Sequence, residues 1–97
     1  MELSSNEILT IRNYFQKQPV LKAFLFGSFS RGEAQSDSDI DILVELDYSK
    51  HIGLSFVKMK LDLEDQLKKK VDLVSSNAVS KHILPFINSD KKLIYER

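Results

Sequence analysis

The chain has no cysteine among its 97 residues. This absence excludes disulfide bridges, thiolate metal sites and catalysis by a thiol. Its longest apolar stretches are only a few residues, far below the roughly twenty that are needed to cross a bilayer. The N-terminus also lacks the basic and then apolar pattern of a secretory signal, so we expect a cytoplasmic location.

Neither sign of charge is in excess, because 14 basic residues balance 14 acidic ones. Net charge therefore supplies no general attraction to nucleic acids or to anionic membranes, and we expect neither as a direct partner. Any polyanion must be bound by a local arrangement. The sequence also lacks internal repeats, low-complexity tracts and linkers, so we expect residues 1–97 to form a single domain.

Two helices are predicted from apolar residues that recur at the spacing of a helical turn. The first covers residues 4–16 and begins with Ser4 and Glu7, a pair that resembles a capping box. The second follows a loop that ends at Gly53 and is expected to be amphipathic. Its predicted apolar face consists of Leu54, Val57, Leu61, Leu63 or Glu64, and Leu67.

Short apolar runs predict strands, and turn residues separate them. The predicted strands are residues 20–26, 39–44, 71–74 and 93–95. Between the last two strands, residues 75–87 are predicted as a helix that is interrupted near Pro85. Alternation of strands and helices predicts an α/β (α+β) fold, in which helices flank a small mixed sheet.

Two aspartates lie in the second predicted strand, where side chains alternate between the faces of a sheet. Asp39 and Asp41 are then on one face, and Ile40 and Ile42 are on the other. Aspartate disfavours strands, and two like charges on one face repel each other unless a cation lies between them. Mg²⁺ prefers carboxylate, phosphate and water oxygens. The pair therefore predicts a metal site.

A Gly-Ser pair ends the first predicted strand, and ten residues separate it from Asp39. Gly27 allows the backbone to approach a phosphate without a Cβ in the way, and Ser28 offers a hydroxyl and an N–H. A helix that begins here would point its N-terminus at the phosphates. Gly-Ser alone is a common turn pair, but together with the downstream aspartates it predicts a triphosphate site.

The segment GSFSRGEAQSDSDID resembles the signature of the nucleotidyltransferase superfamily that includes DNA polymerase beta. It is most similar to the minimal nucleotidyltransferase (MNT) branch, and the later KKKVDLV resembles the strand that carries the family's third carboxylate. The resemblance implies an enzyme that uses Mg²⁺ and ATP. It implies catalytic and metal-binding roles for Asp39, Asp41 and Asp72, with Asp72 as the general base, and nucleotide contacts for Gly27, Ser28, Arg31 and Ser38.

Two of these assignments have structural alternatives. Arg31 suits a phosphate or a partner, but it is equally able to pair with Glu33 or Asp37. Asp72 is preceded by the lysines of residues 68–70 and could pair with one of them.

Members of the MNT branch are typically encoded beside an all-helical HEPN toxin. The resemblance therefore implies a hetero-oligomer with such a toxin, in which this chain is a type VII-like antitoxin. It also implies that the chain transfers AMP to a toxin hydroxyl, which by the family pattern is that of a tyrosine. Two alternatives remain open. The chain could neutralise its toxin by steric binding without catalysis, or it could modify a small molecule such as an aminoglycoside with the help of another chain.

Overall fold

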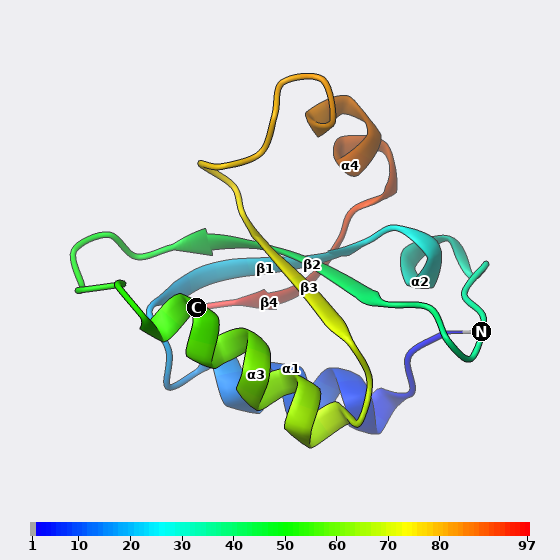
Figure 1. Cartoon of the computed structure of the whole chain (residues 1–97), viewed down its shortest axis with the longest axis horizontal. Coiled ribbons are helices and arrows are strands. Elements are labelled where there is room, and N and C mark those ends of the chain that lie inside the picture. Colours follow the sequence, from blue (N-terminus) through cyan, green and yellow to red (C-terminus); the bar gives the residue numbers. More distant parts are fainter. Residues whose placement is uncertain (1) are drawn as a thin grey trace.

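A four-stranded sheet separates the helices of the computed structural model, which describes residues 2–97. The elements in chain order are α1 (Ser5–Phe15), β1 (Val20–Phe26), α2 (Ser28–Arg31), β2 (Ile40–Leu46), α3 (Ser55–Leu67), β3 (Val71–Ser75), α4 (Leu84–Asp90) and β4 (Lys92–Glu96). Helices α1 and α3 lie side by side on one face of the sheet, and α4 lies on the other side (Figure 1). The predicted α/β (α+β) class is confirmed.

The sheet is mixed and has the strand order β3-β2-β1-β4. Strand β1 is antiparallel to both of its neighbours, whereas β2 and β3 are parallel. Helix α3 connects the parallel pair, as a crossover between parallel strands requires. Strand β2 is therefore central, and the carboxylates of the predicted site lie near the point where β2 begins.

The hydrophobic core lies between the sheet and the pair α1 and α3. Ile11 and Phe15 of α1 and Met59 and Leu63 of α3 have no exposed surface. They pack against strand residues that point to the same face: Ala23, Leu25, Ile40, Ile42, Val44, Val71 and Leu73. Burial of each large apolar side chain contributes about 1.5–3 kcal/mol relative to exposure, so this face supplies most of the stability.

The N-terminus of α1 has the predicted capping box. The Ser4 hydroxyl accepts from the Glu7 N–H at 3.1 Å, and the Glu7 carboxylate accepts from the Ser4 N–H at 3.0 Å. The other carboxylate oxygen of Glu7 pairs with Lys69 at 2.5 Å. This pair connects the start of α1 to the turn before β3, so the helix end and the edge of the sheet hold each other in place.

The predicted apolar face of α3 is wrong in part. Leu54, Val57 and Leu61 are 86%, 53% and 57% exposed. Leu63 and Leu67 are buried as predicted, together with Met59, which was not predicted, and Phe56 is partly buried beside them. Both sets recur at helical spacing, and the docking of α3 on the sheet selects the set that includes Met59, which periodicity alone does not do.

The prediction of a helix over residues 75–87 is wrong for residues 75–83 and confirmed for residues 84–87. Strand β3 extends to Ser75, a turn and loop follow, and α4 begins only at Leu84. Pro85 lies in the first turn of α4, where its missing N–H has no partner within the helix to lose. The proline therefore marks the start of this helix and not a break within it.

No helix within residues 2–97 has the length and apolar character to cross a membrane.

Two leucines of α3 provide a matched test of this packing. Leu63 has no exposed surface, whereas Leu61, two residues earlier, is 57% exposed. We expect Leu63→Ala to lower the free energy of unfolding by about 2–5 kcal/mol, because a cavity is left in the core. Leu61→Ala should change it by about 0.5 kcal/mol or less. Urea denaturation measures both, and equal losses would contradict the described orientation of α3.

Candidate functional site

The pairing of three strands brings the predicted site residues together. Asp41, near the start of β2, pairs with Phe26 of β1 on one side and with Asp72 of β3 on the other. Adjacent strands lie about 4.8 Å apart, and side chains at paired positions share a face. Ile40 and Ile42 are buried against the helices. Asp41 and Asp72 therefore lie side by side on the opposite face of the sheet.

Gly27 follows β1 directly and contacts the Asp41 carboxylate. Its backbone has φ 76° and ψ −154°, a conformation that is essentially restricted to glycine. A Cβ built on Gly27 would lie 2.2 Å from Oδ2 of Asp41. The glycine is thus required by its backbone and by the space that the carboxylate fills. The N–H groups of Ser30 and Arg31 then donate to the Gly27 carbonyl, which starts α2.

Asp39 differs from the prediction in its local structure. Strand β2 begins at Ile40, so Asp39 lies just outside the strand and is exposed. It is still close enough to act on Asp41. The pKa of Asp41 is raised from 3.8 to about 6, first by burial and then by the charges of Asp72 and Asp39, while the charge of Arg31 acts in the opposite direction. The three carboxylates therefore form one electrostatic group.

This group fits a divalent cation that is bound together with a nucleotide. Within residues 2–97, no group of three or more His, Cys, Asp or Glu side chains is arranged to hold a metal ion by itself. Mg²⁺ in nucleotide sites is usually held by one or two carboxylates, with phosphate oxygens and water as the other ligands. The raised pKa of Asp41 shows that the carboxylates are crowded. A divalent cation would offset their mutual repulsion.

The remaining predicted residues lie around this group. Ser28 is half-buried at the start of α2. The Ser38 hydroxyl accepts from the Gln35 N–H at 2.8 Å, so it closes the turn that precedes Asp39. Lys69 pairs with Glu7, and Lys68 lies near Asp65, so neither of these lysines is committed to Asp72.

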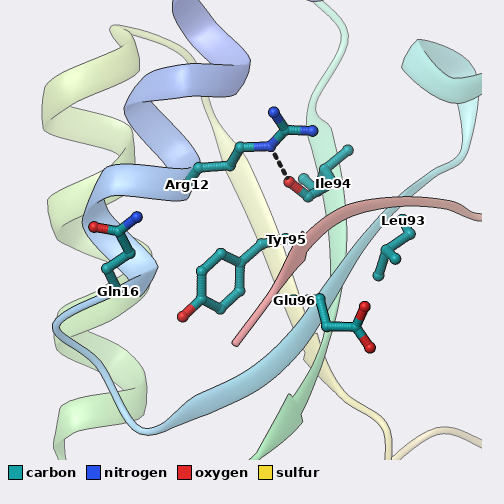
Figure 2. A pocket seen from close by; sticks show the side chains of 6 residues that line it. All are labelled: Arg12, Gln16, Leu93, Ile94, Tyr95 and Glu96. Carbon is teal, nitrogen blue, oxygen red and sulfur yellow. Dashed lines mark hydrogen bonds between the residues drawn. The ribbon is translucent and has the colours of Figure 1, made fainter.

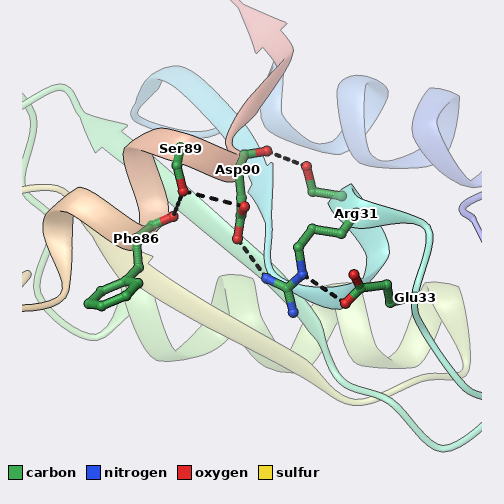
Figure 3. Close-up of polar contacts among 6 residues, drawn as sticks. Arg31, Glu33, Phe86, Ser89 and Asp90 are labelled. Atoms are coloured by element: carbon green, nitrogen blue, oxygen red, sulfur yellow. Dashed lines mark hydrogen bonds and ion pairs between the residues drawn. The ribbon is translucent and has the colours of Figure 1, made fainter.

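Arg31 has two acidic partners (Figure 3). Its Nε donates to Glu33 at 3.0 Å, and its Nη1 pairs with Asp90 at 2.6 Å. The predicted alternative with Glu33 is thus confirmed, whereas Asp37 is not the partner. Asp90 escaped the sequence prediction because it is 59 positions away from Arg31, and no local spacing connects the two.

A hollow of about 310 Å³ lies away from the carboxylates, along the outer edge of β4 (Figure 2). It is lined by Arg12 and Gln16 of α1 and by residues 93–96. Arg12 donates from Nε to the Ile94 carbonyl at 2.6 Å and so covers part of the exposed edge of the strand. Strand β1 separates this hollow from β2, and none of its lining residues was predicted for the site.

The crowding at Asp41 should destabilise the metal-free protein. Since its pKa is raised from 3.8 to about 6, the folded state binds more protons than the unfolded state across this window, and the free energy of unfolding falls as pH rises. Without Mg²⁺ at pH 7.5, we expect Asp41→Asn to stabilise the fold by about 1 kcal/mol, after allowance for solvent screening at a half-buried group. The gain should disappear below about pH 4.

Thermal melts in chelator at several pH values measure this effect, which corresponds to a rise in Tm of roughly 4–8 °C. Asp65→Asn is the control, because the Asp65 side chain is 82% exposed on α3 and its loss should leave Tm nearly unchanged. A lower Tm for Asp41→Asn than for the wild type at pH 7.5 would show that the charge of Asp41 does not destabilise the folded protein.

Comparison with known proteins identifies the family. A family model described as "Polymerase beta, Nucleotidyltransferase" matches residues 10–97. A Methanocaldococcus jannaschii protein, provisionally named protein adenylyltransferase MJ0435, is 43% identical over 63 residues, which are 65% of this chain and 67% of that protein.

Two solved structures have the same fold. One, provisionally described as a minimal nucleotidyltransferase, has a TM-score of 0.80 at 26% identity, and the match covers 95% of each chain. The other is a complex of the tri-AMPylated Shewanella oneidensis HEPN toxin with its MNT antitoxin. It has a TM-score of 0.65 at 22% identity, over 95% of this chain and 69% of that chain, and supports the fold alone. With the family model matched from residue 10 to residue 97, the chain belongs to the polymerase beta family of nucleotidyltransferases.

Proposed function

We propose that this chain is a Mg²⁺-dependent protein adenylyltransferase, which transfers AMP from ATP to a hydroxyl of a HEPN toxin and so acts as its antitoxin. The observation that carries the proposal is the contact of Gly27 with Asp41, which is itself paired with Asp72. Membership of the nucleotidyltransferase family supports the reaction class. The name of MJ0435 supports a protein acceptor, and in the S. oneidensis complex a protein of the same fold binds an AMPylated toxin.

In this proposal the three aspartates have different roles in the transfer. Asp39 and Asp41 hold Mg²⁺, which when bound offsets the negative charge of the triphosphate. Asp72 is exposed beside Asp41 on the same face, so it can accept the proton of an incoming hydroxyl. The acceptor oxygen forms a bond to the α-phosphorus as the bond from that phosphorus to the bridging oxygen breaks. Pyrophosphate then leaves with the electron pair of that bond.

The phosphates are held by the segment between β1 and β2. Without a Cβ at Gly27, the backbone can approach the triphosphate closely, and Ser28 follows with its hydroxyl and N–H. Arg31 lies one turn further along and carries a guanidinium whose fork suits phosphate oxygens. These groups bind and orient the nucleotide so that its α-phosphorus faces the carboxylates.

A protein is the expected acceptor because the carboxylates lie at an accessible face. Asp39 and Asp72 are exposed, and Asp41 is half-buried. Sites for small molecules usually bury most of the ligand in a cavity, whereas an open face allows a side chain of another protein to reach the nucleotide. The acceptor hydroxyl proposed here is that of a tyrosine on the toxin.

The test combines the purified chain with its toxin, Mg²⁺ and ATP, and measures the intact mass of the toxin. We expect the mass to increase by one or more AMP groups, and we expect no increase with the Asp39→Asn/Asp41→Asn double variant. Loss of both charges removes the Mg²⁺ ligands but keeps the shape of the side chains. Toxin activity is measured in the same samples. An unmodified toxin that is still inhibited would favour the steric alternative.

Gly32 is a second glycine at positive φ and serves as a control for Gly27, although its ψ of 15° differs from the −154° of Gly27. Gly27 has φ 76° and Gly32 has φ 73°, but a Cβ at Gly32 would have Glu2 Oε1, at 3.7 Å, as its closest neighbour. We expect Gly27→Ala to reduce the transfer rate by about 100-fold, because the Asp41 carboxylate must shift. Gly32→Ala should cost about 1–3 kcal/mol of stability through strain and keep most of the activity. Similar activity losses in the two variants would contradict this reading.

A further inference from the structure

Asp90, the last residue of α4, contacts two consecutive residues of α2 with two different groups (Figure 3). Its backbone carbonyl accepts from the hydroxyl of Ser30, a side chain that is only 4% exposed. Its carboxylate pairs with Nη1 of Arg31 at 2.6 Å. The main-chain contact joins the two helices, and the carboxylate acts on the guanidinium separately.

The end of α4 is also held at its neighbours. Ile87, one turn earlier, is 3% exposed, and the Lys91 ammonium lies 4.6 Å from the centre of the Phe24 ring, within range of a cation–π interaction. The side chain of Asp90 is 20% exposed, against 43% for that of Arg31. Asp90 is therefore the fixed member of the pair, and Arg31 is the member that is oriented.

The two acids leave part of the guanidinium fork available. Glu33 accepts from Nε and Asp90 pairs with Nη1. In the part of the chain that the structure describes, Nη2 has no such partner, although five N–H donors are present on an arginine. The positive charge of Arg31 also acts on Asp41. The guanidinium is thus held near the carboxylates, and Nη2 can still donate to a ligand.

We infer that Asp90 is a positioning residue for nucleotide binding, which holds the Arg31 guanidinium ready for the triphosphate. This inference rests on the proposed function, since it assumes that a triphosphate binds beside Gly27. A flexible arginine loses conformational freedom when it binds a phosphate, and prior ordering removes a cost of roughly two- to tenfold in affinity. If the ion pair instead held Arg31 away from the nucleotide, the pair would lower the affinity for ATP.

The test measures the affinity for ATP with Mg²⁺ by calorimetry. Asp90→Asn keeps the backbone carbonyl that accepts from Ser30 and removes only the charge. We expect it to weaken ATP binding by about fivefold, with little change in kcat once ATP is saturating. The matched control is Glu33→Gln, because the Glu33 side chain is 65% exposed and its loss should weaken binding by less than about twofold.

The double variant Asp90→Asn/Arg31→Ala shows whether Asp90 acts through Arg31 or through a general effect on the fold. If Asp90 acts through Arg31, Asp90→Asn has no further effect on ATP affinity in that background. Arg31→Lys is the second variant, and it should weaken ATP binding to a similar extent because a lysine lacks the fork that Asp90 holds.

Unchanged or tighter ATP binding by Asp90→Asn would overturn the inference, as would equal weakening with and without Arg31. A wild-type protein that does not bind ATP would instead contradict the proposed function, so the two failures are distinguishable.

Discussion

The site depends on like charges that are held together against their mutual repulsion. Asp41 and Asp72 are paired across the parallel strands β2 and β3, and Asp39 lies just before β2. The charge of Asp41 is unfavourable in the isolated chain, because burial and the neighbouring carboxylates both raise its pKa. The opposite face of the same strands compensates. There Ile40 and Ile42 are fully buried against α1 and α3, and this packing fixes the strand register that places the aspartates.

The backbone around the carboxylates is adapted to them as well. Gly27 leaves room for Asp41 where any side chain would collide with it. Arg31 supplies a cation close by, and Asp90 keeps that cation in place from the end of α4. The site is therefore built from the ends of β1, α2, β2, β3 and α4, and it stays accessible on the face opposite the core. An accessible site of this kind suits an enzyme whose acceptor is a second protein.

Local sequence patterns predicted much of this arrangement. The alternation in β2 correctly predicted that Asp41 lies on the face opposite Ile40 and Ile42, and the Gly-Ser pair correctly predicted the turn that ends β1. Asp72 was predicted from the resemblance of KKKVDLV, and Asp39 lies outside the strand that was predicted to contain it. Prediction failed where tertiary contacts decide. Leu61 and Leu63 were both predicted on the apolar face of α3, but the docking of the helix buries Leu63 and leaves Leu61 exposed. The pairing of Arg31 with Asp90 depends on α4, which is close in space and distant in sequence.

The central claim is that the crowded carboxylates form a binding site for a divalent cation and its nucleotide. Its most direct test is the titration of the Asp41 carboxyl, followed by NMR through its ¹³C shift, with and without Mg²⁺ and a non-hydrolysable ATP analogue. The account predicts a pKa of about 6 in the free protein and a clear fall when Mg²⁺ and the analogue are added, because the cation favours the charged form. A pKa near the ordinary aspartate value of about 3.9 in the free protein, or one that Mg²⁺ and the analogue leave unchanged, would contradict it.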